Sequence, residues 1–184
     1  MRAFFNLGLV ISGILSVILI LPSCSTKPTS WAKYSDRNFS IRMPEKPQVY
    51  DRQEATPFGK QTVHYVTWKP ESLELNKFRL FQVSYTDYPS RLATDTATMN
   101  MSMDSSINAR KRDFTELDVI SQPIEINGYP GRAFILSPDK DNVVTIVKQI
   151  VANNKLFDLT VVAKKDYPTN NEINDFFNSF QVLR

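Results

Sequence analysis

The sequence predicts an α+β fold in which an antiparallel sheet carries two helices. Segments with the alternating apolar and polar side chains of half-buried strands recur along the chain. Two stretches without Pro or Gly instead place apolar residues at helical spacing. The last four strands follow one another through short turns, so we expect them to pair in antiparallel fashion.

Seven strands are expected, and each has a composition or a boundary that indicates it. Pro44 ends the first, because proline cannot donate a hydrogen bond to the ladder. The second and third are rich in β-branched and aromatic residues. Turns at Asn127-Gly128, 139–142 and Asn153-Asn154 separate the last four. The expected strands are Phe39–Met43, Gln61–Trp68, Phe78–Thr86, Leu117–Ile126, Arg132–Ser137, Val143–Ala152 and Lys155–Ala163.

The two expected helices differ in character. The stretch Thr94–Phe114 places Met99, Met103 and Ile107 at helical spacing, with Thr94 or Asp95 as its N-cap. The second helix follows Pro168, and Thr169–Asn171 offer its N-cap. Its apolar stripe consists of Ile173, Phe176, Phe177 and Phe180.

Composition excludes several function classes. The chain has 184 residues and a formal net charge of +3, which is too small a surplus for a nucleic-acid-binding face. One Cys excludes an internal disulfide, and one His with one Cys leaves too few ligands for most structural zinc sites. No phosphate-binding glycine loop and no Gly-x-Ser-x-Gly motif is present. We therefore expect no catalytic residues, no metal and no cofactor.

The N-terminal segment is typical of a secretory signal peptide. Arg2 precedes a nearly pure apolar run from Leu7 to Leu21, and small residues follow. The ending Leu21-Pro22-Ser23-Cys24 resembles the bacterial lipobox. That resemblance implies cleavage before Cys24 and acyl chains on its sulfur and amine. The alternative is an uncleaved membrane helix, since residues 3–21 are just long enough to span a bilayer.

These features divide the chain into three parts. Residues 1–23 form the signal peptide, 24–30 the lipidated Cys24 and a polar tether, and 31–184 a single folded domain. Two or three acyl chains suffice for stable membrane attachment. The expected location is therefore the bacterial cell envelope, with the domain facing the periplasm or the exterior. Whether the inner or the outer membrane holds it is left open.

An ordered set of short motifs resembles the PsbP/Mog1-like superfamily across residues 31–184. Trp31-x-x-Tyr34 leads into the Phe39–Pro47 segment, and aromatic and turn motifs follow in the order typical of these domains. The later motifs are Asn127-Gly128-Tyr129-Pro130-Gly131-Arg132, Asn154-Lys155-Leu156-Phe157-Asp158-Leu159 and Phe176-Phe177-Asn178-Ser179-Phe180. The resemblance implies a three-layer α/β/α sandwich around an antiparallel sheet. It also implies a mostly non-enzymatic role, because known members include photosystem subunits, assembly factors and envelope lipoproteins.

Two functional hypotheses follow from the sequence. The first is a membrane-anchored, non-catalytic module that binds or assembles a protein partner. Its candidate contact residues are Tyr129 and Arg132, residue types that are enriched at interfaces. The alternative is an envelope small-ligand carrier or enzyme with a pocket between helix and sheet, near His64, Trp68 and Tyr85.

Overall fold

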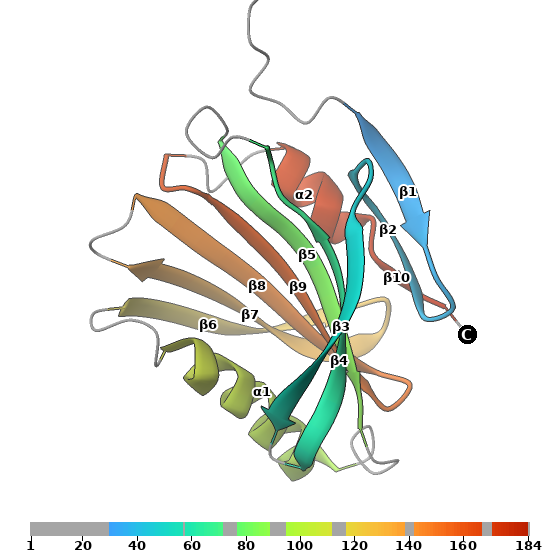
Figure 1. The fold of residues 1–184 in the computed structure, drawn as a ribbon. Helices are drawn as coiled ribbons and strands as arrows, with labels where there is room; N and C mark the ends of the chain where they lie inside the picture. The colour runs from blue at the N-terminus through green and yellow to red at the C-terminus, as the bar shows by residue number, and fades with distance from the viewer. Residues whose placement is uncertain are drawn as a thin grey trace, which may run out of the picture.

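The computed structural model describes residues 30–56, 58–71, 77–88, 95–111, 117–138, 142–166 and 171–183. These residues form ten strands and two helices (Figure 1). The strands are β1 (Trp31–Ser35), β2 (Phe39–Pro44), β3 (Gln48–Thr56), β4 (Gly59–Trp68), β5 (Phe78–Asp87), β6 (Leu117–Ile126), β7 (Tyr129–Pro138), β8 (Val143–Ala152), β9 (Lys155–Lys164) and β10 (Gln181–Val182). The helices are α1 (Thr96–Lys111) and α2 (Asn171–Asn178).

Seven of the strands form one antiparallel sheet in the order β3-β4-β5-β9-β8-β7-β6. The expected hairpin run from β6 to β9 is confirmed, and the bounds of β6 and β8 agree with the prediction. Both residues of the Asn127-Gly128 turn have positive φ, as do Asn153 and Asn154. A two-residue hairpin turn of the favoured mirror-image type requires this backbone conformation.

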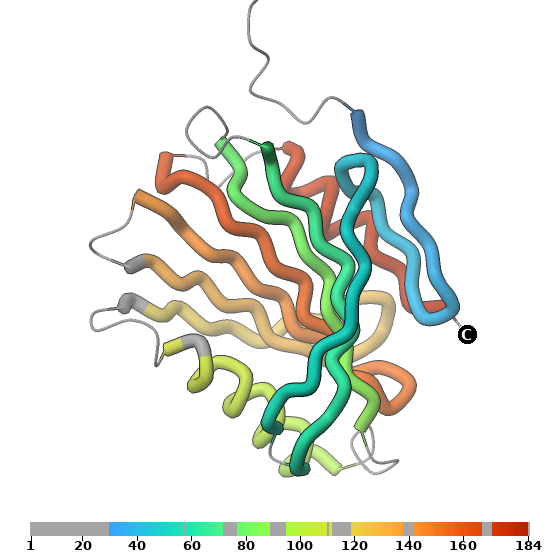
Figure 2. The backbone as a smooth tube through the Cα atoms, viewed as in Figure 1, coloured from blue at the N-terminus to red at the C-terminus, as the bar shows by residue number. Residues whose placement is uncertain are grey.

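The expected α/β/α sandwich is wrong. Strands account for 63% of the described residues, and one outer layer is largely a second sheet, β1-β2-β10. The reason is that Phe39–Pro44 does not join the large sheet. It pairs with Trp31–Ser35 in a hairpin of its own and turns Phe39, Ile41 and Met43 towards the large sheet. Helix α2 lies beside this small sheet, whereas α1 lies on the opposite side of the large sheet (Figure 2).

The core on the α2 side is aromatic and closed. It combines the small sheet, the apolar stripe of α2 and alternate residues of β5, β8 and β9. Phe39, Phe81, Phe157 and Phe176 have no exposed surface. Phe39 stacks on Phe180 at 5.7 Å between ring centroids, and Phe81 meets Phe176 at 5.2 Å. The predicted stripe of α2 is therefore confirmed as a core face.

The core on the α1 side is smaller and divided. Met103 packs against Val151 and Leu156, and Ile107 packs separately against Phe134 and Val147. The expected spacing of Met103 and Ile107 is thus confirmed. Between and beside these two clusters, the face that α1 covers is polar, and this polarity creates the candidate site described below.

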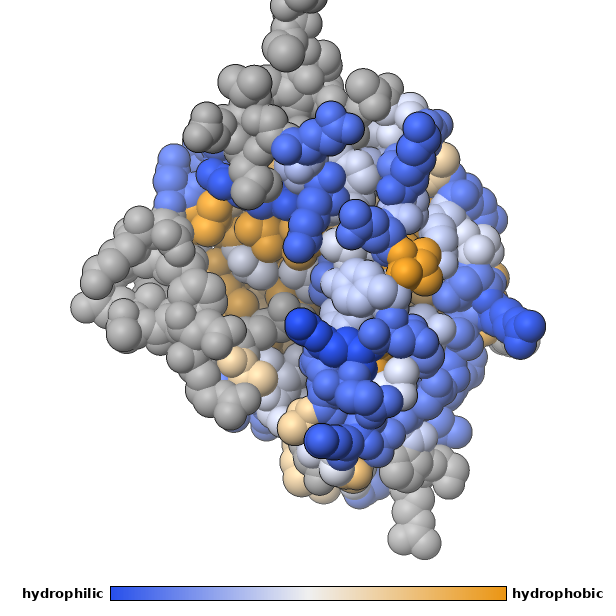
Figure 3. Space-filling model, in the orientation of Figure 1, coloured by the Kyte–Doolittle hydropathy of each residue, from blue (hydrophilic) through white to orange (hydrophobic). Residues whose placement is uncertain are grey.

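Strand β3 was not expected. It lies at one edge of the large sheet, and most of its nine residues are exposed. An edge strand with mostly exposed residues lacks the alternating apolar and polar pattern by which half-buried strands are recognised. Figure 3 shows that hydrophilic side chains dominate the surface over β3 and β4 in this view. No helix of the described residues is long and apolar enough to cross a membrane.

Candidate functional site

A row of polar residues crosses the large sheet on the side of α1. Strand pairing places these residues in register, one from each of the neighbouring strands, and because side chains alternate along a strand they share one face. From β7 to β3 the row reads Arg132, Gln149, Asp158, Ser84, Tyr65 and Tyr50. Of the seven buried polar residues that the structure describes, only Ser40 lies outside this face and its helix.

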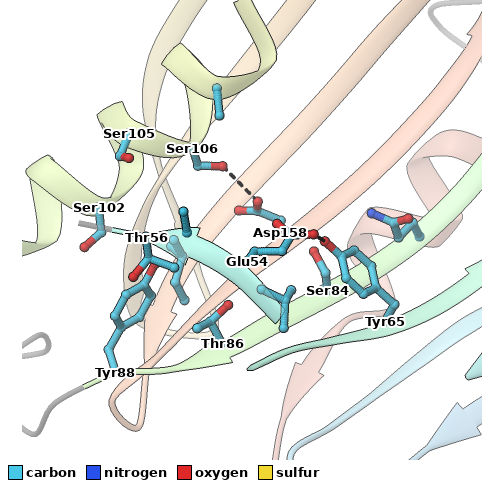
Figure 4. A pocket seen from close by; sticks show the side chains of 15 residues that line it. Glu54, Thr56, Tyr65, Ser84, Thr86, Tyr88, Ser102, Ser105, Ser106 and Asp158 are labelled. Carbon is cyan, nitrogen blue, oxygen red and sulfur yellow. Dashed lines mark hydrogen bonds between the residues drawn. The ribbon is translucent and has the colours of Figure 1, made fainter. Parts of the chain in front are cut away.

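The middle of this row forms the floor of a pocket of about 290 Å³ between α1 and the sheet. Strands β3, β4, β5 and β9 supply the floor and walls, and α1 closes one side (Figure 4). Eight of its lining side chains carry hydroxyl groups and two carry carboxyl groups. These ten residues are Glu54, Thr56, Tyr65, Ser84, Thr86, Tyr88, Ser102, Ser105, Ser106 and Asp158.

Neutral donors hold the carboxyl group of Asp158. Gln149, which is fully buried, donates its amide Nε2 to Asp158 Oδ1 at 2.8 Å. Ser106 of α1 donates its hydroxyl to Asp158 Oδ2 at 3.0 Å. The first bond fixes the carboxyl group from within the sheet, and the second connects it to the helix. Together the two bonds fix the orientation of the Asp158 carboxyl group at the cleft.

The second carboxyl group is held by a tyrosine. Tyr65 donates its hydroxyl to Glu54 Oε1 at 2.5 Å across β3 and β4. Burial, reinforced by this hydrogen bond and by the charge of Glu54, raises the pKa of Tyr65 well above its ordinary value. Burial likewise raises the pKa of Tyr88 to about 12, with a smaller contribution from Asp158. Both tyrosines therefore carry their protons at neutral pH.

Two hydroxyl groups on the floor have no partner among the described residues, and neither oxygen is one of the buried atoms that lack a partner, so both are open to the cleft. Ser84 is 5% exposed and Thr86 is 6% exposed, and neither hydroxyl bonds to any residue within the described ranges. Figure 4 shows both side chains among the residues that line the cleft. Beside the pocket, Gln149 Oε1 and Thr160 Oγ1 also lack a partner in the described part of the chain. Buried polar groups are normally satisfied, so this face resembles a binding surface more than a structural core.

The described lining offers many hydrogen-bonding groups, but no serine beside the base that usually activates it. A serine nucleophile needs a base such as His or Lys within hydrogen-bond reach. Among the described residues that line the pocket there is no His, Lys or Arg. Within the described residues there is also no group of three or more His, Cys, Asp or Glu side chains that could hold a metal ion.

His64 lies away from the pocket. Its ring stacks on Tyr85 at 4.6 Å between centroids, and its Nδ1 lies 2.8 Å from Asp51 Oδ1. Trp68 packs near Phe81 in the α2-side core. None of His64, Trp68 and Tyr85 lines the pocket. The expected helix–sheet pocket therefore exists, but it opens on the other face of the sheet and other residues line it.

The two candidate contact residues lie on opposite faces of the sheet. Tyr129 packs against the α2-side core. Arg132 binds α1 instead, where its Nη1 pairs with Asp104 and its Nη2 donates to Asn100 Oδ1 at 2.7 Å. The two residues therefore do not form one contact surface. Their role towards a partner stays a prediction, and Cys24 lies outside the described residues.

The sequence contains a local signal for the polar face that lines the pocket. Gln82, Ser84 and Thr86 alternate with the apolar core residues of β5, and Asp158 and Thr160 do the same in β9. Such alternation indicates a polar face. Only the non-local pairing of β5 with β9, and the position of α1 over them, show that this face is covered.

Comparison with known proteins supports the fold and goes no further. No family model matches the chain, and no curated protein matches it in sequence. The solution structure of the cyanobacterial PsbP protein (CyanoP) from Synechocystis superimposes with a TM-score of 0.53 at 17% identity, covering 88% of this chain and 98% of that one. The chain therefore has a PsbP-like fold. A protein of unknown function from Pseudomonas aeruginosa, described as a putative regulator, superimposes with a TM-score of 0.39 at 9% identity. The alignment covers 74% of this chain and 84% of that one.

Proposed function

We propose that this chain is a lipid-anchored module of the cell envelope that binds a protein partner and carries out no catalysis. One observation carries the anchoring part of the proposal. The only cysteine ends a signal-like segment, and the first described strand begins at Trp31, seven residues beyond Cys24. Six intervening residues reach about 20 Å at most, so an acylated Cys24 would hold the domain close to its membrane.

The PsbP-like fold and the chemistry of the cleft support a non-catalytic role. A second feature supports a protein contact. Ile120 of β6 is 64% exposed, and its register partner Ile135 of β7 is 37% exposed. Exposed apolar side chains side by side at the edge of a sheet are typical of interaction surfaces. This edge supports an interface better than the separated pair Tyr129 and Arg132 does.

Crosslinking in the living cell tests the proposal. A photoreactive residue is placed at Ile120, with Ser121 on the same strand as the matched position, in the wild type and in Cys24→Ser. We expect one partner to be captured from position 120 of the anchored protein only. Palmitate labelling that Cys24→Ser abolishes is the expected sign of the anchor. An unlabelled wild type would contradict the anchor, and equal capture from both positions or from the released variant would contradict the interface.

A further inference from the structure

The cleft under α1 has the properties of a small-molecule binding site. Ser84 and Thr86 present hydroxyl groups on its floor that bond to no other described residue, and neither oxygen is among the buried atoms that lack a partner, so both are open to the cleft. Hydroxyl groups that face a cleft without a protein partner are available to a ligand or to ordered solvent. The volume of about 290 Å³ lies at the lower end of small-molecule sites.

The lining restricts the charge of such a ligand. Glu54 and Asp158 both face the cleft, and within the described part of the chain no Lys, Arg or His lines it. A carboxylate or phosphate ligand would meet like charge without a compensating cation, which disfavours anions. The ligand is therefore neutral or cationic.

The hydrogen-bonding groups of the lining distinguish between a neutral and a cationic ligand. An ammonium group has three donors and no acceptor, so it would satisfy carboxylates but leave the hydroxyl protons of Ser84 and Thr86 without a partner. Both carboxyl groups already accept protein donors, from Tyr65 at Glu54 and from Ser106 and Gln149 at Asp158. A hydroxyl group of a ligand both donates and accepts, and it matches a lining in which hydroxyls outnumber carboxyls by eight to two.

We propose that the cleft between α1 and strands β3, β4, β5 and β9 binds a small neutral polyhydroxylated ligand of the saccharide class. Ser84 and Thr86 bind its hydroxyls from the floor, and Glu54 and Asp158 accept hydrogen bonds from its hydroxyl groups. The site is independent of the protein interface proposed above, because it lies on the face of the sheet covered by α1 and not at the β6 edge.

Four matched probes test the charge and the chemistry of the ligand. Glucose, glucosamine and glucuronate share one ring and differ in charge, and ethanolamine supplies the ammonium group without the polyol. Each is titrated against the full-length protein in detergent, and binding is followed by ligand-observed NMR. We expect glucose to bind, and glucuronate to bind at least tenfold more weakly. Binding of ethanolamine without glucose, or of none of the four, would overturn the proposal.

A pair of isosteric substitutions locates the binding. The double variant Ser84→Ala, Thr86→Val removes both floor hydroxyls with little change in shape, and Ser121→Ala on β6 is the control. Two lost hydrogen bonds predict an affinity about tenfold lower or more for the double variant, and no change for the control. Far-ultraviolet circular dichroism verifies that each variant is folded. Unchanged glucose affinity in a folded double variant would place the sugar elsewhere and contradict the site.

Discussion

The two faces of the large sheet use the same strands for different purposes. On the α2 side, β5, β8 and β9 present Phe81, Ile150 and Phe157, none of which has any exposed surface. On the α1 side, the intervening residues of the same strands are Ser84, Gln149 and Asp158. Helix α2 seals its face with three buried side chains, whereas α1 docks through two small apolar clusters and several polar bonds. The α2 side thus holds most of the buried apolar side chains, whereas the α1 side presents polar groups between two small apolar clusters.

The largest effect expected from this comparison is the loss of an aromatic side chain from the α2-side core. Phe157 contacts Phe39, Tyr85 and Phe180, with ring centroids 5.4–6.1 Å apart. We expect Phe157→Ala to lower the free energy of unfolding by about 3–5 kcal/mol, measured by urea denaturation. The matched variant Met103→Ala removes a buried side chain from the α1 side and should cost less. Equal losses of unfolding free energy in the two variants would show that the two faces contribute equally to stability.

The second prediction concerns the sheet that separates the faces. A Cβ atom added at Gly131 would lie 2.1 Å from the backbone oxygen of Gln149. Neither strand can shift easily to relieve this clash, because β7 and β8 each pair with a neighbouring strand along both edges. We expect Gly131→Ala to lower the free energy of unfolding by roughly 1–3 kcal/mol in the same urea assay. A wild-type unfolding midpoint would mean that β7 and β8 separate more freely than the structure indicates.

The third prediction uses alkaline pH and one tyrosine of the α1 side. Burial raises the pKa of Tyr88 to about 12, whereas an unfolded tyrosine titrates near 10. Between these values the unfolded state loses its proton first, so the stability falls as the pH rises from 10 to 12. Tyr88→Phe should flatten this decline, as measured by urea midpoints at several pH values. An unaltered pH profile would show that Tyr88 is not buried in the cleft as described.

The smallest expected effect on the free energy of unfolding comes from the polar floor of the cleft. It tests most directly whether the α1 side contributes little to stability. The double variant Ser84→Ala, Thr86→Val removes two hydroxyl groups that face the cleft and have no partner among the described residues. We expect the free energy of unfolding to change by less than about 1 kcal/mol, or to rise, because no hydrogen bond within the protein is lost. Differential scanning calorimetry measures this change. A strong destabilisation would mean that these hydroxyls serve the fold and not a ligand.

The sequence predicted those elements whose signals are local. The turns at Asn127-Gly128 and Asn153-Asn154 and the stripe on α2 follow from neighbouring residues, and these elements were located correctly. The second sheet was missed, because nothing local shows whether Phe39–Pro44 pairs with the large sheet or with the strand before it. The face on which the cleft opens, and the residues that line it, were missed for the same reason. Its residues come from four strands and a helix, and Ser and Thr on a polar face look alike whether solvent or a helix covers them.

The position of β1 has a mechanical consequence. This strand is the outer member of the small sheet and pairs only with β2, from Trp31 opposite Pro44 to Ser35 opposite Ser40. Tension applied through the proposed tether would load that ladder at its open end, so its hydrogen bonds would break one after another and not all together. Release of five residues would lengthen the tether by about 17 Å while leaving the seven-stranded sheet intact. If Cys24 is anchored as proposed, the hairpin would act as an extensible coupling between the membrane and the seven-stranded sheet.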